Sequence, residues 1–232
     1  MAEGVRLVEE ALEAAVPLRG VVVAADFPGT ARADALLREI AGRAVPFEQV
    51  PVRLFRELAG AETPQGVLAV IEHPTWTFDQ LDPGRGRPVL VLDAVQDPGN
   101  VGTLLRTAFA LGAAGAVLLR GSADLQNPKV LRAGMGATFR LPIVSATPAE
   151  CVAWARRTSV HVWTTAAEGT LLQRATAPER LALVVGNEGA GIRPELRECA
   201  ELQVAVPLAR GAESLNVAVA AGILLYEVIR GS

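Results

Sequence analysis

PVLVLDAVQDPGNVGTLLRTAFALGAAGAVLL, residues 88–119, joins two apolar runs through a helix-like segment. Such near-continuous apolar runs are typical of parallel strands that are covered on both faces of a sheet. The same alternation continues toward the C-terminus, with further strands predicted at 141–146, 160–167, 181–186 and 202–208. Helices are predicted between most of these strands, at 100–112, 128–137, 148–158, 192–200 and 214–230. This order predicts an α/β fold built on a parallel sheet.

The residues before this stretch predict a second, smaller α/β unit. Helices are expected at 3–15, 31–42 and 51–60, and extended segments at 20–25, 45–50 and 65–72. Prolines and glycines then interrupt all periodicity, which is typical of a linker. We therefore expect a small N-terminal unit at 1–73, a linker at 74–87 and a larger unit at 88–232.

The amino-acid composition limits the classes of protein to which this chain can belong. The chain has 232 residues, of which 50% are hydrophobic and 20% charged, so it is expected to fold. It contains no apolar run of about 18 residues and no basic-then-apolar leader, so neither a membrane span nor a secretory signal is expected. The isolated Cys151, Cys199, His73 and His161 predict no metal site and a reduced, cytoplasmic setting. A formal charge of −3 argues against nucleic-acid binding by bulk charge, although a local basic site remains compatible with it.

The last predicted helix, 214–230, is apolar nearly all round. That pattern implies burial against something on every side. Its apolar stretch is too short to span a bilayer, so a protein interface is the better explanation.

Three predicted loops at strand ends join small residues to polar groups, and ligands of open parallel sheets bind at such ends. In the first, residues 93–108, Pro98 and Gly99 make a turn and Asn100 can cap the helix that follows. Arg106 lies further along that helix. It is either a surface arginine or a planar, bidentate ligand for a phosphate or ribose.

The second loop, residues 181–196, carries glycines in the order G-x-x-G-x-G from Gly186. The dinucleotide fingerprint has the order G-x-G-x-x-G, so a nucleotide-dependent oxidoreductase is disfavoured. The glycines would let a ligand approach the backbone, whereas the carboxylate of Glu188 would repel phosphate. A plain turn and a loop for a cationic or neutral nucleoside both fit this pattern.

In the third loop, residues 204–221, Val206-Pro207-Leu208 ends a strand, and either Ser214 or Asn216 can cap the last helix. Leu215 between these two polar residues is unusual for a cap unless it packs on a ligand or a neighbouring loop. The plain cap and the ligand contact remain open alternatives here.

Taken together and in order, these loops resemble the three motifs of the SpoU (TrmH-like) family of RNA ribose 2′-O-methyltransferases, in the SPOUT class. The matching residues are Asn100-Val101-Gly102 with Arg106, Gly186-Asn187-Glu188-Gly189, and Val206-Pro207-Leu208 with Ser214-Leu215-Asn216. The N-terminal unit resembles the L30e-like substrate-binding domain of many members, with TPQGVLAVIE (63–72) as its closing strand. Relatives with this domain begin upstream of the part that matches Met1–Gly4, so an N-terminally trimmed unit is one expectation.

The resemblance implies a SPOUT fold with a C-terminal trefoil knot that holds S-adenosylmethionine. The family's cofactor contacts match Gly186, Val206 and Leu215, with Leu208 close by. The family works as a homodimer with its active site at the subunit interface, which agrees with the apolar last helix. Carried over to this chain, the catalytic set is Asn100, Arg106, Glu188, Ser214 and Asn216.

Their implied roles differ. Asn100 and Asn216 would position the ribose and the motif backbone, and Ser214 would cap the helix or contact the substrate. Glu188 would support Arg106 or its own loop. Arg106 would act from the partner subunit, and since arginine is normally protonated, we favour a role in holding phosphate or the ribose oxygen over one as a base.

Because the chain as a whole is negatively charged, RNA would then have to bind at a local basic site. The basic side chains near the first and third loops are either solvated or part of a phosphate track, and they are Arg120, Lys129, Arg132, Arg140 and Arg210. The two-unit layout favours ribosomal RNA, specifically 23S rRNA, as the substrate. The alternatives are a transfer-RNA enzyme of the same class and a non-catalytic RNA-binding or ribosome-assembly factor with the same fold.

Overall fold

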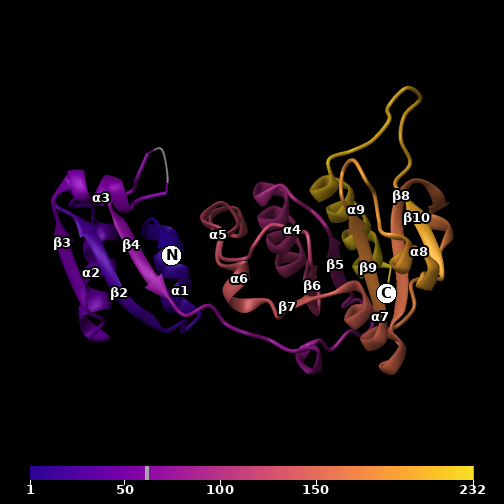
Figure 1. Cartoon of the computed structure of the whole chain (residues 1–232), viewed down its shortest axis with the longest axis horizontal. Coiled ribbons are helices and arrows are strands. Elements are labelled where there is room, and N and C mark those ends of the chain that lie inside the picture. The colour runs from indigo at the N-terminus through magenta and orange to yellow at the C-terminus, as the bar shows by residue number, and fades with distance from the viewer. Residues whose placement is uncertain (61–62, 232) are drawn as a thin grey trace.

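The chain forms two α/β units that lie side by side and are joined by an extended segment (Figure 1). This computed structural model describes residues 1–60 and 63–231. No helix among them is long and apolar enough to cross a membrane.

The N-terminal unit contains, in its described part, a four-stranded sheet with the order β1-β4-β2-β3. β2 runs parallel to β3 and antiparallel to β4. The strands are β1 (Ala2–Glu3), β2 (Leu18–Ala24), β3 (Phe47–Val50) and β4 (Val67–Ile71). The helices are α1 (Val5–Glu13), α2 (Ala31–Gly42) and α3 (Val52–Leu58). α1 is amphipathic and buries its apolar stripe, which includes Leu7, Val8, Ala11 and Leu12.

The predicted helix at 3–15 is shorter than expected. Residues 2–3 form β1 instead, with Ala2 opposite Ala69 in antiparallel pairing. Gly4 separates strand from helix with a φ of 97°, a conformation that glycine adopts at little cost. The backbone of Ala15, with a φ of 54°, leaves the helix at the other end.

The larger unit has, among the described residues, a six-stranded sheet with the order β10-β8-β9-β5-β6-β7. Every neighbouring pair in it is parallel, as the apolar runs predict. The strands are β5 (Val89–Asp93), β6 (Gly115–Leu119), β7 (Ile143–Ala146), β8 (His161–Leu171), β9 (Leu181–Gly186) and β10 (Leu202–Ala205). The prediction of an α/β fold on a parallel sheet is therefore confirmed.

Helices cover both faces of this sheet. The core on one face includes residues of α4 and α9, and the core on the other includes residues of α7 and α8. The helices are α4 (Pro98–Leu111), α5 (Pro128–Gly134), α6 (Ala137–Arg140), α7 (Pro148–Arg157), α8 (Pro194–Cys199) and α9 (Val217–Arg230). Short 3₁₀ turns are η1 (Phe78–Gln80) and η2 (Leu172–Arg174).

The single helix predicted at 128–137 is wrong, because α5 and α6 replace it. Met135 and Gly136 both adopt left-handed backbone conformations, with φ of 46° and 82°, and these end one helix and begin the next.

α5 packs closely against α4. A Cβ atom on Gly102 of α4 would lie 2.5 Å from the Cβ of Ala133 and 2.6 Å from the carbonyl oxygen of Val130. These distances are shorter than any van der Waals contact, so only glycine lets the two helices approach this closely.

The linker region lies against the larger unit. Phe78 of η1 stacks on Trp154 of α7, with ring centroids 5.3 Å apart. The ring centroid of His73, the last residue before the linker, lies 6.0 Å from that of Phe139 on α6. The segment is irregular, as its prolines and glycines predict, but its aromatic side chains are packed.

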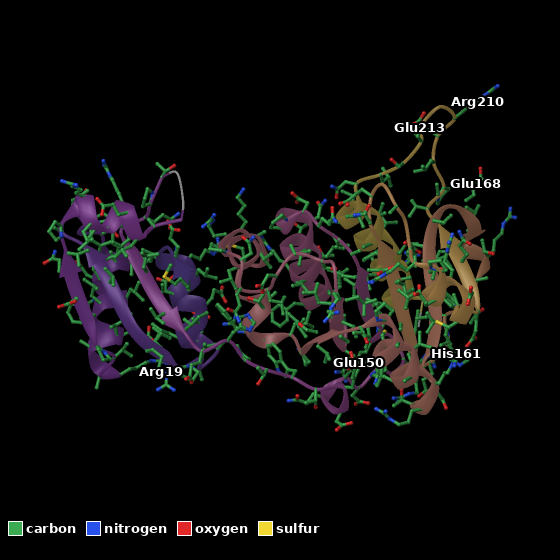
Figure 2. All side chains as sticks on the ribbon, in the orientation of Figure 1. Arg19, Glu150, His161, Glu168, Arg210 and Glu213 are labelled. Carbon is green, nitrogen blue, oxygen red and sulfur yellow. The ribbon has the colours of Figure 1, made fainter. Side chains whose placement is uncertain are left out.

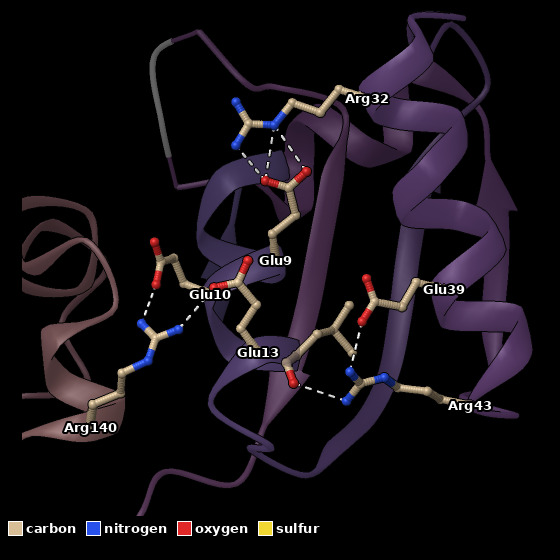
Figure 3. A network of polar contacts seen from close by, with 8 residues as sticks. Glu9, Glu10, Glu13, Arg32, Glu39, Arg43 and Arg140 are labelled. Atoms are coloured by element: carbon tan, nitrogen blue, oxygen red, sulfur yellow. Dashed lines mark hydrogen bonds and ion pairs between the residues drawn. The ribbon is translucent and has the colours of Figure 1, made fainter.

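The two units meet where α1 and β1 face α5 and α6. Arg140 of α6 forms ion pairs with Glu10 and Glu13 of α1 (Figure 3). Arg132 of α5 pairs with Glu3, whose side chain is 4% exposed. Apolar contact accompanies these charges, because Leu131 and Phe139 belong to the core cluster of the N-terminal unit.

Candidate active site at the strand ends

The second and third of the loops singled out in the sequence line one cavity of about 430 Å³, whereas no residue of the first loop lines it. It lies beyond β9 and is closed by the segment that connects β10 to α9. All four residues predicted as cofactor contacts line it: Gly186, Val206, Leu208 and Leu215. Glu188, Ser214 and Asn216 of the predicted catalytic set line it as well.

The second loop forms one wall of the cavity. The backbone N–H groups of Asn187 and Gly191 each donate to the other's carbonyl oxygen, at 3.1 and 2.9 Å, and close a tight turn. A Cβ on Gly186 would lie 2.6 Å from the backbone of Gly191 and from the side chain of Ile192. The glycine at 186 is thus required by close approach of the loop to itself.

Asn187 holds this loop in place, a role that its position in the motif alone did not predict. Its Nδ2 donates to the carbonyl oxygen of Ala94, at 3.0 Å, just beyond β5. Its Oδ1 accepts from the backbone N–H groups of Gly189 and Ala190, both at 2.9 Å. The available signal was an asparagine at the start of a glycine-rich turn, where its side chain can satisfy the backbone.

A chain of polar contacts joins the three loops. Asn100 Nδ2 donates to Glu188 Oε1 at 2.6 Å, and Asn216 Nδ2 donates to Asn100 Oδ1 at 3.0 Å. Asn216 Oδ1 in turn accepts from the N–H of Ala218 and so caps α9. Each amide has both ends engaged, which fixes its orientation.

The predicted capping role of Asn100 is wrong. Asp97 caps α4 instead, and its Oδ1 accepts from the backbone N–H of Asn100 at 2.8 Å. Asn100 lies inside the first turn, so its side chain is free to reach Glu188. Of the two cap candidates for α9, Asn216 fills the position and Ser214 does not.

Arg106 is not part of the cavity. It lies on α4 with an exposed side chain, and no hydrogen bond or ion pair to it is found among the described residues. Beside it, α4 and α9 form a shallow groove of about 540 Å³, which both Asn100 and Asn216 also line.

Within the single chain, α9 is buried on one face only, and the protein interface expected for its other face stays a prediction. Ala221, Leu224, Leu225 and Val228 pack into the core. The opposite face exposes Val219, Ile223 and Tyr226, which are 52, 40 and 51% exposed. This face lines the groove between α4 and α9.

The predicted basic track is only partly available for RNA. Arg132 and Arg140 are engaged in the ion pairs between the two units, so they are not free phosphate ligands. Arg120 and Lys129 remain exposed, and Arg210 projects from the tip of the loop between β10 and α9 (Figure 2).

No cysteine or histidine is among the described residues that line this cavity. Burial raises the pKa of Cys151 to about 12 and also raises the pKa of Cys199. Within the described ranges, no group of three or more His, Cys, Asp and Glu side chains could hold a metal ion.

Comparison with known proteins agrees with this geometry. Residues 87–226 match the SpoU rRNA methylase family, and residues 1–77 match the RNA 2′-O ribose methyltransferase substrate-binding domain. The chain belongs to the SpoU rRNA methylase family.

Named relatives include the 23S rRNA (guanosine(2553)-2′-O)-methyltransferase RlmP of Bacillus subtilis (strain 168). It is 43% identical over 175 residues, which cover 75% of this chain and 68% of the relative. The 23S rRNA (uridine(2479)-2′-O)-methyltransferase of Streptomyces viridochromogenes is 32% identical, over 98% of this chain and 81% of the relative.

Solved structures show the same two-unit architecture. The SpoU methyltransferase AviRb from Streptomyces viridochromogenes, in complex with AdoMet, superposes with a TM-score of 0.86 at 32% identity. The match covers 99% of this chain and 88% of that one. An AdoMet-bound rRNA methyltransferase from Sinorhizobium meliloti gives a TM-score of 0.85 at 30% identity, over 99% of this chain and 86% of that one.

Proposed function

We propose that this protein is an S-adenosylmethionine-dependent methyltransferase that modifies a ribose 2′-hydroxyl of 23S rRNA in the cytoplasm. The observation that carries the proposal is the convergence of Gly186, Val206 and Leu215 on one cavity, beside the Asn100–Glu188 contact. The names of two relatives, both 23S rRNA 2′-O-methyltransferases, support the substrate class.

The cavity suits the cofactor. Its volume of about 430 Å³ lies in the range of small-molecule sites. Ile192, Val206 and Leu215 offer apolar walls for an adenine ring, and the glycine-rich backbone permits close approach. The carboxylate of Glu188 would attract a cationic sulfonium and would repel a phosphate.

The residues of the chain supply geometry for the reaction. A ribose hydroxyl is a weak nucleophile at neutral pH, so it must be oriented and its proton must be accepted. The bound cofactor would supply a methyl group on a positively charged sulfur. Asn100 would direct its fixed amide at the ribose, and Arg106 would hold the phosphate or the ribose oxygen with its planar fork.

A homodimer is part of this proposal. Arg106 lies outside the cavity of its own chain, while the exposed apolar face of α9 adjoins Asn100 and Asn216. A second copy docked on this face would bury Val219, Ile223 and Tyr226, and an arginine of one copy would then reach the cavity of the other.

The trefoil knot expected from the family is also proposed. β10 lies at the edge of the sheet next to β8, yet the segment that follows it returns to the cavity beside β9. α9 contacts both β9 and η2, which supports passage of the chain through the loop formed by residues 166–180.

Transfer RNA is the weaker substrate candidate. The structure that describes methylation of C/U34 on tRNA covers 64% of this chain with a TM-score of 0.57. The full-length structural matches instead include rRNA methyltransferases and have the additional N-terminal unit. That unit is the feature that favours rRNA.

The test is to map methylated riboses in total RNA from cells with and without the protein. We expect one additional 2′-O-methyl mark in 23S rRNA, and none with an Asn100→Ala variant at equal abundance. A new 2′-O-methyl mark in tRNA would show instead that the substrate is tRNA and not 23S rRNA. The absence of any new mark, with wild-type protein folded and bound to S-adenosylmethionine, would favour a non-catalytic RNA-binding factor.

A further inference from the structure

A buried ion pair lies directly behind the second loop. Asp93, the last residue of β5, is fully buried, and Arg193 follows the loop at the start of α8. The backbone N–H of Arg193 donates to Asp93 Oδ2 at 2.8 Å, and its Nε donates to Oδ1 at 2.6 Å. Nη2 of the same arginine also forms an ion pair with Oδ1.

This pair connects three strand ends. Besides Asp93 at the end of β5, Arg193 Nη2 reaches the carbonyl oxygen of Arg120 beyond β6, at 3.1 Å. Arg193 itself ends the loop that begins at β9. A lysine has one charged nitrogen and could not make these separate contacts in the same plane.

The contacts hold the second loop at both ends. At its start, Asn187 donates to the carbonyl oxygen of Ala94, the residue after Asp93. At its end, Arg193 is bound to Asp93. Glu188 lies between these two anchors, so the position of its carboxylate depends on both. Neither Asp93 nor Arg193 lines the cavity.

We propose that Asp93 and Arg193 are a positioning pair that sets the second loop, and with it Glu188, for cofactor binding and methyl transfer. The inference rests on the proposed function. A buried carboxylate needs a matched partner to be tolerated, and this one uses a fork-shaped partner to fix a loop geometry. The pair acts through Glu188 and the loop backbone and does not touch the reacting atoms.

The test compares Arg193→Lys with wild-type protein. The lysine keeps the positive charge near Asp93 but loses the planar contacts, so the fold should survive while the loop shifts. We expect the Kd and KM for S-adenosylmethionine to rise about tenfold and kcat to fall, with the KM for RNA unchanged. The melting temperature should change by only a few degrees.

Two further variants make the test decisive. Arg197→Ala removes another arginine of α8, one that is exposed and lies outside the cavity, and it should leave all constants unchanged. Should Arg193→Lys fail to fold, the neutral double variant Asp93→Asn/Arg193→Gln, which leaves no buried charge, replaces it. It should show the same rise in cofactor KM.

The outcomes separate this inference from the proposed function. If wild-type protein does not bind S-adenosylmethionine in a calorimetric titration, the proposed function fails. If it binds, and the folded variants bind the cofactor and turn over as wild type does, the positioning role is refuted. An equal rise in the KM for the cofactor and in the KM for RNA would also refute it, because it would indicate general destabilisation of the protein.

Discussion

Asn100 and Glu188, which are 88 positions apart in the chain, share a hydrogen bond of 2.6 Å, and Glu188 lines the cavity. The bond fixes an amide of α4 against a carboxylate of the second loop. Because Asp97 caps α4, the side chain of Asn100 is not needed to hold its helix.

Replacement of Asn100 by alanine should therefore reduce catalysis more than stability. We expect kcat to fall about a hundredfold, the loss typical of one removed positioning donor, with a small change in melting temperature. Transfer of labelled methyl groups to rRNA measures the rate. Gln96→Ala, an exposed neighbour, is the matched control, and full activity of Asn100→Ala would remove Asn100 from the site.

Arg106→Ala should abolish methylation and leave cofactor affinity and stability close to wild type. Affinity and stability should be kept because Arg106 is exposed, lies outside the cavity and has no ion pair or hydrogen bond among the described residues. Activity and calorimetry on the same preparation test this. Arg157→Ala, an exposed arginine on α7, should stay active. Undiminished turnover by Arg106→Ala would contradict the role.

Ile223→Glu should separate the proposed dimer into monomers. The side chain is 40% exposed in the single chain, so the charge is tolerated there but not in an apolar interface. Sedimentation at micromolar concentration measures the mass, and methylation should be lost with the dimer. Phe47→Glu, a similarly exposed apolar site on β3, should remain dimeric. Monomeric wild-type protein would refute the shared site.

Arg140→Ala should loosen the contact between the two units. It leaves the partly buried Glu10 and the exposed Glu13 without their partner, so we expect a loss of about 1–2 kcal/mol, between the values for exposed and buried pairs. Proteolysis within residues 74–87 should become faster. Arg19→Ala, whose partner Glu72 is exposed, should cost less than about 0.5 kcal/mol. Identical behaviour of the two variants would contradict this.

The burial of Cys151 should make the stability of the protein depend on alkaline pH. Burial raises the pKa of its thiol from the ordinary value of 9.0 to about 12 in the folded protein. The folded state favours the neutral thiol, so its contribution to stability is complete below pH 9 and is lost as pH rises toward 12. The free energy of unfolding in urea should therefore fall more steeply between about pH 9 and 11 for wild type than for Cys151→Ala. Parallel curves would show that this thiol does not contribute.

The sequence was sufficient for the features that depend on local pattern. Apolar runs such as 181–186 and 202–208 marked the strands, and glycine-rich or polar loops marked the ends at which the cavity lies. The cap of α4 was also recognisable in principle, since Asp97 precedes Pro98, a favoured pair at a helix start. Asn100 was the less suitable candidate because it comes two residues after that proline.

Contacts between distant segments could not be read in this way. Arg132 and Arg140 have the pattern of solvated helix residues, and only the fold reveals that glutamates of α1 and β1 neutralise them. The pair of Asp93 and Arg193 likewise spans 100 positions. The roles assigned to the site residues stay predictions until the variants above are measured.

Gly102 brings α4 into close contact with Ala133 and Val130 of α5. α5 in turn contacts the N-terminal unit through Leu131 and Arg132. The N-terminal unit and the helix that carries Asn100 are therefore positioned relative to each other by α5. A larger residue at position 102 would push α4 away from α5 and so change the spacing between the N-terminal unit and Asn100.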